Sequence, residues 1–247
     1  MKIGIAVADS KTQYFINQAY VDLVAMAGFE PILISPSNSS GFMAEICDGL
    51  LLPGGIDIDP IYYNEDNIAC YGSDEVRDTF ERNLMNAFIH RNKKIFGICR
   101  GFQLMVREFI HRHPEDSTSL TFFQHVNDHA LADERKVARS ARTHSVSADV
   151  TTLYGKEAAV YEKIFVNSMH HQALIINQAH PKTIGVDDNN SFEILAATTF
   201  GTTKKEKIFI VEGVDIKLEG CNLRGVQWHP EELKEYDLLH AFFGMPE

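Results

Sequence analysis

The stretch from residue 94 to residue 105 sets the strongest limit on how this chain can fold. It begins as a run of apolar, β-favouring residues, passes through Gly97, Cys99 and Gly101, and continues with helical spacing. That spacing is carried by Phe102, Leu104, Met105 and Phe109. A strand that bends abruptly into a helix crowds any Cβ at the turn, and the flanking glycines relieve this crowding. The stretch therefore predicts a strand, a sharp turn and a helix, with Cys99 at the junction.

A cysteine at such a junction has two interpretations. The N-terminus of a helix stabilises a thiolate, which is the reactive form, and the geometry is that of a nucleophile elbow with Cys in place of Ser. Free cysteine is also a common small apolar core residue, in which case Cys99 is only a buried thiol. The stretch by itself leaves both interpretations open.

Length, composition and charge narrow the class of protein. The chain has 247 residues and 45% apolar content, enough to bury a core, and no linker, repeat or low-complexity tract divides it. We therefore expect a single domain over residues 1–247. The formal net charge of −11 argues against a general nucleic-acid or membrane-surface binder. Small molecules or proteins are the expected partners, with no nucleic acid and no membrane.

The cysteines and the absence of targeting patterns suggest a compartment. The four cysteines are widely spaced without a Cys-x-x-Cys pair, which fits neither a disulfide framework nor a thiolate zinc site. The first residues lack a signal-peptide pattern, and no apolar run approaches the ~18 residues that a membrane span requires. We expect a cytoplasmic protein.

Strand and helix patterns alternate along the first half of the chain, which predicts an α/β fold with a mostly parallel central sheet flanked by helices. The expected strands are 3–8, 30–34 and 49–52, and the expected helices are 14–28, 42–47 and 74–91. In the last of these helices we expect Phe80, Leu84, Ala87 and Phe88 to face inward and Arg77, Asp78, Glu81 and Arg82 to face outward.

The second half is richer in strand patterns and predicts additional β elements. They fall at 145–150, 164–167, 192–199, 207–211 and 223–228, before a final helix at 235–243. Between the halves, residues 111–142 are polar and aperiodic, which is typical of a lid or an insertion. This segment contains His111, His113, His125 and His129, but no carboxylate or thiolate pattern completes a metal site there, so we expect no metal.

Two further motifs can complete a site around Cys99. His229 follows a strand pattern and Pro230 stops further strand pairing, so Glu231, two residues on, can point the same way and orient the ring. Gly54 and Gly55 end another strand and can bring backbone N–H groups close to a ligand, although a tight turn alone also explains them. A lone histidine at a strand end usually packs. The combination with the Cys99 elbow instead favours a nucleophile, a base and an orienting acid.

Four segments together resemble the class I glutamine amidotransferase-like superfamily, closest to its gamma-glutamyl-gamma-aminobutyrate hydrolase family. They are the segments 97–103, 52–55, 166–172 and 225–231, read in sequence as GICRGFQ, LPGG, VNSMHHQ and GVQWHPE. The resemblance covers nearly the whole chain and implies a flavodoxin-like three-layer sandwich. It implies Cys99 as nucleophile, His229 as general base and then acid, and Glu231 as its orienter.

The resemblance also implies the rest of the site. Backbone N–H groups of Gly55 and Arg100 would form the oxyanion hole, and the substrate-binding positions would be Gly54, Gln103, Ser168 and His170. It implies no cofactor and leaves homodimer formation open. The chain departs from the family where the helix after the elbow continues through residues 106–114 without a Gly-Gly turn, which puts the leaving-group specificity in doubt.

Three functions are compatible with these residues. The first is a cysteine hydrolase that cleaves the gamma-glutamyl amide of a small compound, such as gamma-glutamyl-gamma-aminobutyrate, through a glutamyl thioester. The second is a glutaminase subunit that delivers ammonia from glutamine to a separate partner synthetase. The third is a binding protein that has lost its activity, against which the intact Cys99, His229 and Glu231 argue.

Overall fold

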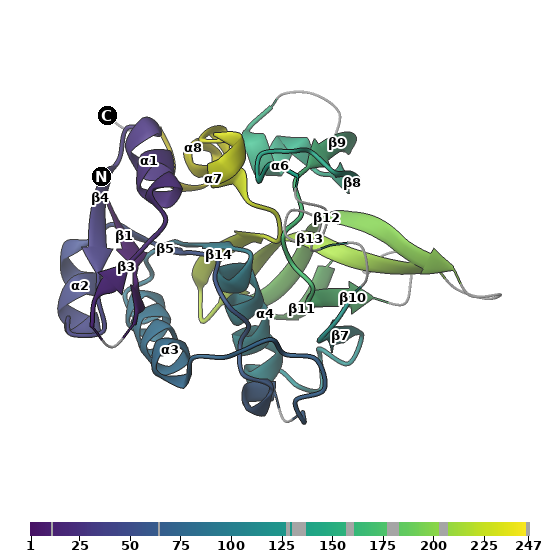
Figure 1. Ribbon diagram of the computed structural model, residues 1–247, viewed down its shortest axis with the longest axis horizontal. Coiled ribbons are helices and arrows are strands. Elements are labelled where there is room, and N and C mark those ends of the chain that lie inside the picture. The colour runs from purple at the N-terminus through teal and green to yellow at the C-terminus, as the bar shows by residue number, and fades with distance from the viewer. Residues whose placement is uncertain are drawn as a thin grey trace.

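A computed structural model describes residues 1–10, 12–63, 65–126, 129, 137–156, 161–176, 183–202 and 207–245 of the chain. Five adjacent parallel strands form the centre of its main sheet, in the spatial order β4-β1-β5-β6-β14 (Figure 1). Their bounds are Lys2–Ala6 for β1, Glu30–Ile34 for β4, Gly49–Leu52 for β5, Ile95–Ile98 for β6 and Cys221–Val226 for β14. The mostly parallel central sheet is confirmed.

Helices cover both faces of this parallel part. Along β5, Leu51 packs into the apolar cluster of α1 and α8, whereas Leu50 and Leu52 pack into the cluster of α2, α3 and α4. This alternation follows from the two-residue period of a strand, and it produces the three expected layers. The helices are α1 (Gln18–Met26), α2 (Ser40–Ile46), α3 (Glu75–Ile89), α4 (Arg100–Arg112) and α8 (Asp237–Phe243).

Antiparallel strands extend the sheet beyond β14, on the right of Figure 1, and are the additional β elements expected from the second half. The long hairpin of β12 (Asn190–Thr202) and β13 (Lys207–Leu218) is followed by β8 (His144–Ala148) and β9 (Glu162–Val166). The remaining strands are β7 (Leu120–Phe123), β10 (Ala173–Ile176) and β11 (Thr183–Asp187), and α6 (Val150–Tyr154) lies beside α8.

The helix expected from residue 14 begins later, at Gln18. Asn17 accepts a hydrogen bond from the N–H of Ala19 and caps the helix, whereas Tyr14 and Phe15 form the short strand β3, paired with β2 (Ala8–Asp9). A side-chain cap of this kind fixes where a helix starts, and the apolar spacing upstream of it belongs to the hairpin.

The expectation that α3 faces solvent through its charged residues is wrong for three of them. Arg77, Asp78 and Glu81 are buried, because the fully buried guanidinium of Arg100 enters from α4 and binds both carboxylates. Arg77 also binds Glu81, with 2.7 Å between Nε and Oε1. The apolar side of the helix is as expected, with Phe80, Leu84 and Phe88 buried.

Part of the expected lid at 111–142 lies outside the described residues, namely 127–128 and 130–136, and the lid stays a prediction. Within this range β7 pairs with β10 and belongs to the sheet. All four cysteines are free. Among the helices in the described ranges, none has the length and apolar character needed to cross a membrane.

Candidate active site

Cys99 stands at the turn between β6 and α4, and its backbone adopts φ 51° and ψ −103°. Residues other than glycine rarely adopt these backbone angles, and such strain is typical of functional turns. The flanking glycines make the turn sterically feasible: a Cβ on Gly97 would lie 2.7 Å from the carbonyl carbon of Gly101, and a Cβ on Gly101 would lie 2.2 Å from the oxygen of Leu52. The strand, turn and helix expected from the sequence are all present.

His229 reaches the same place from the neighbouring strand. β14 pairs with β6 so that Val226 lies opposite Ile98. Cys99 directly follows β6, and His229 lies a short step beyond the end of β14. Pro230 then begins the short helix α7 (Pro230–Leu233), which turns Glu231 back toward the ring. The distance between His229 Nδ1 and Glu231 Oε1 is 2.6 Å, and both side chains are buried. Glu231 therefore fixes the orientation of the imidazole.

The electrostatics of this pair favour a protonated ring. Burial disfavours the charged imidazole, but the Glu231 carboxylate and the Cys99 sulfur outweigh it and raise the pKa of His229 to about 10. A charged imidazolium beside a thiol nucleophile is the arrangement that cysteine hydrolases use.

Asn167 and Tyr20 also hold the site, and sequence reasoning did not give them these roles. The Asn167 amide accepts from the backbone N–H of His229 at 2.9 Å and donates to its carbonyl at 3.1 Å, so one side chain clamps both sides of the histidine backbone. The Tyr20 hydroxyl lies 3.4 Å from His229 Nδ1 and accepts from the Gly54 N–H at 3.0 Å. Asn167 lies in the VNSMHHQ segment, whereas Tyr20 resembles any core residue of α1 in the sequence.

The glycine turn after β5 lies close to both the nucleophile and the base. A Cβ on Gly54 would lie 2.9 Å from His229 Cε1 and 3.5 Å from Cys99 Cβ. Tyr20 already takes the Gly54 N–H, while in the described part of the chain no hydrogen bond occupies the N–H of Gly55. Arg77 donates to the Gly54 carbonyl at 2.9 Å from below the turn. The turn is therefore held in place with one backbone donor available for a ligand.

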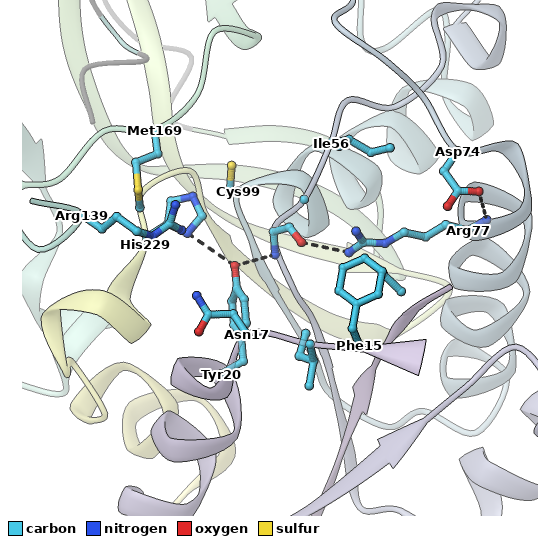
Figure 2. Close-up of a pocket in the computed structure, with 14 residues that line it drawn as sticks. Phe15, Asn17, Tyr20, Ile56, Asp74, Arg77, Cys99, Arg139, Met169 and His229 are labelled. Carbon is cyan, nitrogen blue, oxygen red and sulfur yellow. Dashed lines mark hydrogen bonds between the residues drawn. The ribbon is translucent and has the colours of Figure 1, made fainter. Parts of the chain in front are cut away.

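Two cavities meet at Cys99, of about 380 and 270 Å³. Figure 2 shows the larger one, with Cys99, His229, Arg139 and Met169 around its centre and Arg77 on the opposite side. The two cavities share Cys99 and Met169 together with Gly55 and Ile56. A molecule bound in both would pass directly over the sulfur.

A model of the family described as Peptidase C26 matches residues 3–231. The chain belongs to the Peptidase C26 family. It is 31% identical over 221 residues to Protein NtpR of Enterococcus hirae, covering 88% of this chain and 81% of that protein. It is 27% identical over 238 residues to the gamma-glutamyl-gamma-aminobutyrate hydrolase PuuD of Escherichia coli, covering 92% and 83%.

The fold is also that of known glutaminases. The glutaminase domain of Trypanosoma brucei CTPS, solved with bound acivicin, superimposes with a TM-score of 0.54 at 14% identity, over 100% of this chain and 95% of that one. The family and the named relatives make this Peptidase C26 member a glutamine amidotransferase-like hydrolase. The expected superfamily and its three-layer fold are confirmed.

The expected substrate-binding residues of this Peptidase C26 member separate into two groups. Gly54 lines the larger cavity, while Gln103 and His170 line the smaller one. Ser168 lines neither cavity, and its buried hydroxyl donates to the backbone carbonyl of His129. The geometry thus brings three of the four toward Cys99 and gives Ser168 a structural contact.

The smaller cavity has additional walls that the sequence did not single out. His171 binds Asp57 with 2.9 Å between Nε2 and Oδ2, and the ring of Tyr71 stacks on it at 3.9 Å between centroids. Gln172 is buried with both its amide oxygen and nitrogen lacking partners in the described residues. Met169 contributes to both cavities.

The other three thiols lie in less reactive surroundings. Burial raises the pKa of Cys47 and Cys70, and it raises that of Cys221 to about 12. None of the three lines either cavity at Cys99. A reagent directed at the cavity therefore has Cys99 as its target.

Proposed function

We propose that this Peptidase C26 member hydrolyses the gamma-glutamyl amide bond of a small compound through a glutamyl thioester on Cys99. The observation that carries the proposal is that Cys99 and His229 both lie against the Gly54 turn, with Cys99 at the junction of two cavities. A nucleophile, an oriented base and backbone donors are the parts that acyl transfer requires.

The chemistry follows from these positions. The Cys99 sulfur attacks the gamma-carbonyl carbon, and the N–H groups of Gly55 and Arg100 receive the developing oxyanion. His229, held by Glu231, gives its proton to the departing amine and leaves the glutamyl group on sulfur as a thioester. A water molecule then loses a proton to His229 and attacks the thioester, which releases glutamate and restores the Cys99 thiolate beside the protonated His229.

The two cavities divide the substrate between them. Gln103 donates to Gln227 at 3.1 Å and to the Gln172 carbonyl at 3.3 Å, so the wall of the smaller cavity is a polar network suited to the amino-acid end of the glutamyl group. The larger cavity would receive the leaving amine. There Arg139 binds Glu232 through Nε at 2.6 Å, and within the described residues no hydrogen bond occupies its terminal nitrogens.

This arrangement favours a leaving amine that carries a carboxylate, as gamma-aminobutyrate does, because a guanidinium recognises carboxylates. Replacement of Arg139 by Gln should raise KM for gamma-glutamyl-gamma-aminobutyrate by roughly tenfold, about 1.4 kcal/mol. KM for a gamma-glutamyl amide with an uncharged amine should change little. Equal changes for both substrates would place the leaving amine elsewhere.

The decisive experiment measures amine release across gamma-glutamyl amides with wild-type protein and with Cys99→Ala as the blank. The expected result is partner-independent hydrolysis that Cys99→Ala abolishes. A mechanism-based glutamine analogue should label Cys99 and not Cys70, the cysteine with greater exposure, as shown by peptide mass spectrometry. Hydrolysis that persists in Cys99→Ala would sink the proposal.

The same assay separates the alternatives. A glutaminase subunit would prefer free glutamine and respond to a partner synthetase, whereas the proposed hydrolase prefers the larger amide without any partner. A protein that binds without catalysis would leave Cys99 unlabelled and all substrates intact.

A further inference from the structure

Three histidines and one carboxylate from distant parts of the sequence gather beside the smaller cavity. Glu212 of β13 is completely buried, and its Oε1 lies 3.1 Å from His144 Nε2 on β8 and 3.8 Å from His170 Nε2. The ring of His129 lies 5.2 Å from that of His144 and 5.3 Å from that of His170, between centroids. Donor atoms of His129, His144 and Glu212 all lie within 4.8 Å of one another. We call these four residues the His-Glu cluster.

The tautomer of His170 indicates that the cluster holds a cation. His170 Nδ1 is 2.9 Å from the backbone carbonyl of Gln172, and because a carbonyl only accepts, Nδ1 carries the proton. In a neutral ring Nε2 then presents a lone pair toward the Glu212 carboxylate, and two electron-rich groups repel each other unless a positive charge lies between them. A histidine that donates through one nitrogen to a carbonyl is the usual form of a metal-ligating histidine.

The charge balance of the cluster leads to the same conclusion. The Glu212 side chain is completely buried, and the groups next to its carboxylate are the rings of His144 and His170, at 3.1 and 3.8 Å between Oε1 and Nε2. A buried carboxylate needs a cationic partner, and no Lys or Arg ion pair with Glu212 occurs in the described residues. His144 Nδ1, His170 Nε2 and Glu212 Oε2 are all buried without a hydrogen-bond partner there.

We infer that His129, His144, His170 and Glu212 bind a divalent transition-metal ion of the Zn²⁺ type. Imidazole nitrogens and one carboxylate oxygen are ligands that zinc accepts in a tetrahedral set. Zinc-to-nitrogen bonds of about 2.0–2.1 Å place the ligand atoms of such a site roughly 3.3–3.5 Å apart. The His144 and Glu212 donors are already 3.1 Å apart, and the donors that are up to 4.8 Å apart need to close by about 1.4 Å at most around the ion.

Hydrogen bonds already hold the backbone of two of the proposed ligands, His129 and His170, next to each other. The carbonyl of His129 accepts from the N–H of His170 at 3.2 Å and from the Ser168 hydroxyl, which holds the His129 segment against the turn that carries His170. Ser168, which lines neither cavity, thus positions one ligand beside another. A preorganised backbone of this kind reduces the ordering cost of binding.

A short chain of hydrogen bonds also connects the His-Glu cluster with Cys99. The backbone carbonyl of Glu212 accepts from the N–H of Gln227 at 2.8 Å, and the Gln227 amide lies 3.5 Å from Cys99 Sγ. The cluster adjoins the smaller cavity through His170, whereas Glu212 and His144 line neither cavity at Cys99. Metal binding can therefore be tested without any assay of hydrolysis.

The test measures metal content directly. Purified protein is stripped with a chelator, reloaded with Zn²⁺ or Co²⁺, desalted and analysed by elemental mass spectrometry, with the visible spectrum of the Co²⁺ form reporting its coordination. We expect one ion per chain, a Co²⁺ spectrum typical of four-coordinate sites, and a rise in Tm when metal is added.

Variants assign the site. His144→Gln and Glu212→Gln should weaken Zn²⁺ affinity by at least about a hundredfold, since loss of even an outer contact to a metal ligand costs 10–100-fold. His129→Gln should do the same, and because His129 and His144 are both half-buried, their variants serve if Glu212→Gln fails to fold. His111→Gln, an exposed histidine near the end of α4, is the matched control and should bind as wild type does.

Two results overturn the inference. One is a wild-type protein that folds without retaining any metal after reloading, in which case a protonated histidine balances Glu212. The other is metal that persists unchanged in His144→Gln and His129→Gln, which would place the ion at another site.

Discussion

The contact between His229 and Glu231 makes the stability of the folded state depend on pH. The His229 pKa of about 10 lies above the ordinary value near 6.5, so the folded state binds this proton more tightly than the unfolded chain does. The resulting stabilisation is fully present below about pH 6.5 and is lost as the pH rises through about 10.

Glu231→Gln removes the negative charge that stabilises the buried, protonated ring of His229. We expect kcat for gamma-glutamyl amide hydrolysis to fall by roughly 10³–10⁴-fold, as when an orienting acid is neutralised in other triads. The difference in unfolding free energy between wild type and variant should be largest below about pH 6.5 and should shrink above about pH 10. Denaturant titrations across pH measure it, and a difference that grows with pH would contradict the assignment.

Asn167 acts on the backbone of His229 and not on its ring. Asn167→Ala removes two buried hydrogen bonds to His229 and a third to the Arg139 carbonyl, so we expect a loss of about 1–3 kcal/mol in unfolding free energy. For an amide with an uncharged leaving amine, kcat should fall with little change in KM. Asn190→Ala, at the half-buried first residue of β12, removes hydrogen bonds to Asp187 and Glu219 and is a control that should leave kcat unchanged. If Asn167→Ala affects KM and not kcat, the residue contacts substrate directly.

At the scale of elements, the pairing of α3 with α4 decides the position of the elbow. Arg100 is the first residue of α4, and its guanidinium is anchored between Asp78 and Glu81 of α3. The backbone N–H proposed for the oxyanion therefore belongs to a residue whose side chain is fixed from behind. This side chain is 1% exposed, so it does not select the leaving amine by direct contact.

Arg100→Met tests this anchor. Removing one partner of a buried ion-pair network leaves carboxylates unpaired, and we expect the unfolding free energy to fall by about 3–5 kcal/mol. Arg82→Met, whose partner Glu108 lies 3.3 Å away and whose side chain is 33% exposed, should cost no more than about 1 kcal/mol. Chemical denaturation of both variants provides the comparison, and equal losses would show that the network contributes no more than a surface pair.

The parts of the fold and of the candidate site that depend on local motifs were predictable from the sequence. The elbow and the His229-Pro230-Glu231 turn are set by neighbouring residues, so periodicity and turn chemistry suffice to place them. The buried face of α3 was mispredicted because periodicity assigns charged residues to solvent, and only the partner on α4 shows that Arg77, Asp78 and Glu81 belong inside. Tyr20 and the His-Glu cluster depend entirely on tertiary contacts.

At the scale of the whole molecule, the sequence predicts one domain, and the single tryptophan offers a test. Trp228 is fully buried beside His229, and its ring N–H donates to Glu235 at 3.1 Å. If residues 1–247 unfold as one unit, Trp228 fluorescence and far-ultraviolet circular dichroism should give the same denaturation midpoint. Two separated midpoints would indicate that the antiparallel extension unfolds independently.

The sheet order has a consequence for synthesis of the chain on the ribosome. β6 carries Cys99 but pairs on one side with β14, and Gln227, just beyond β14, is 128 residues later than Cys99. At ordinary rates of translation, an interval on the order of ten seconds separates them, during which β6 is an open edge. The nascent chain therefore contains Cys99 before it contains His229. We expect Cys99 to have no general base, and the chain no hydrolase activity, until β14 has joined the sheet.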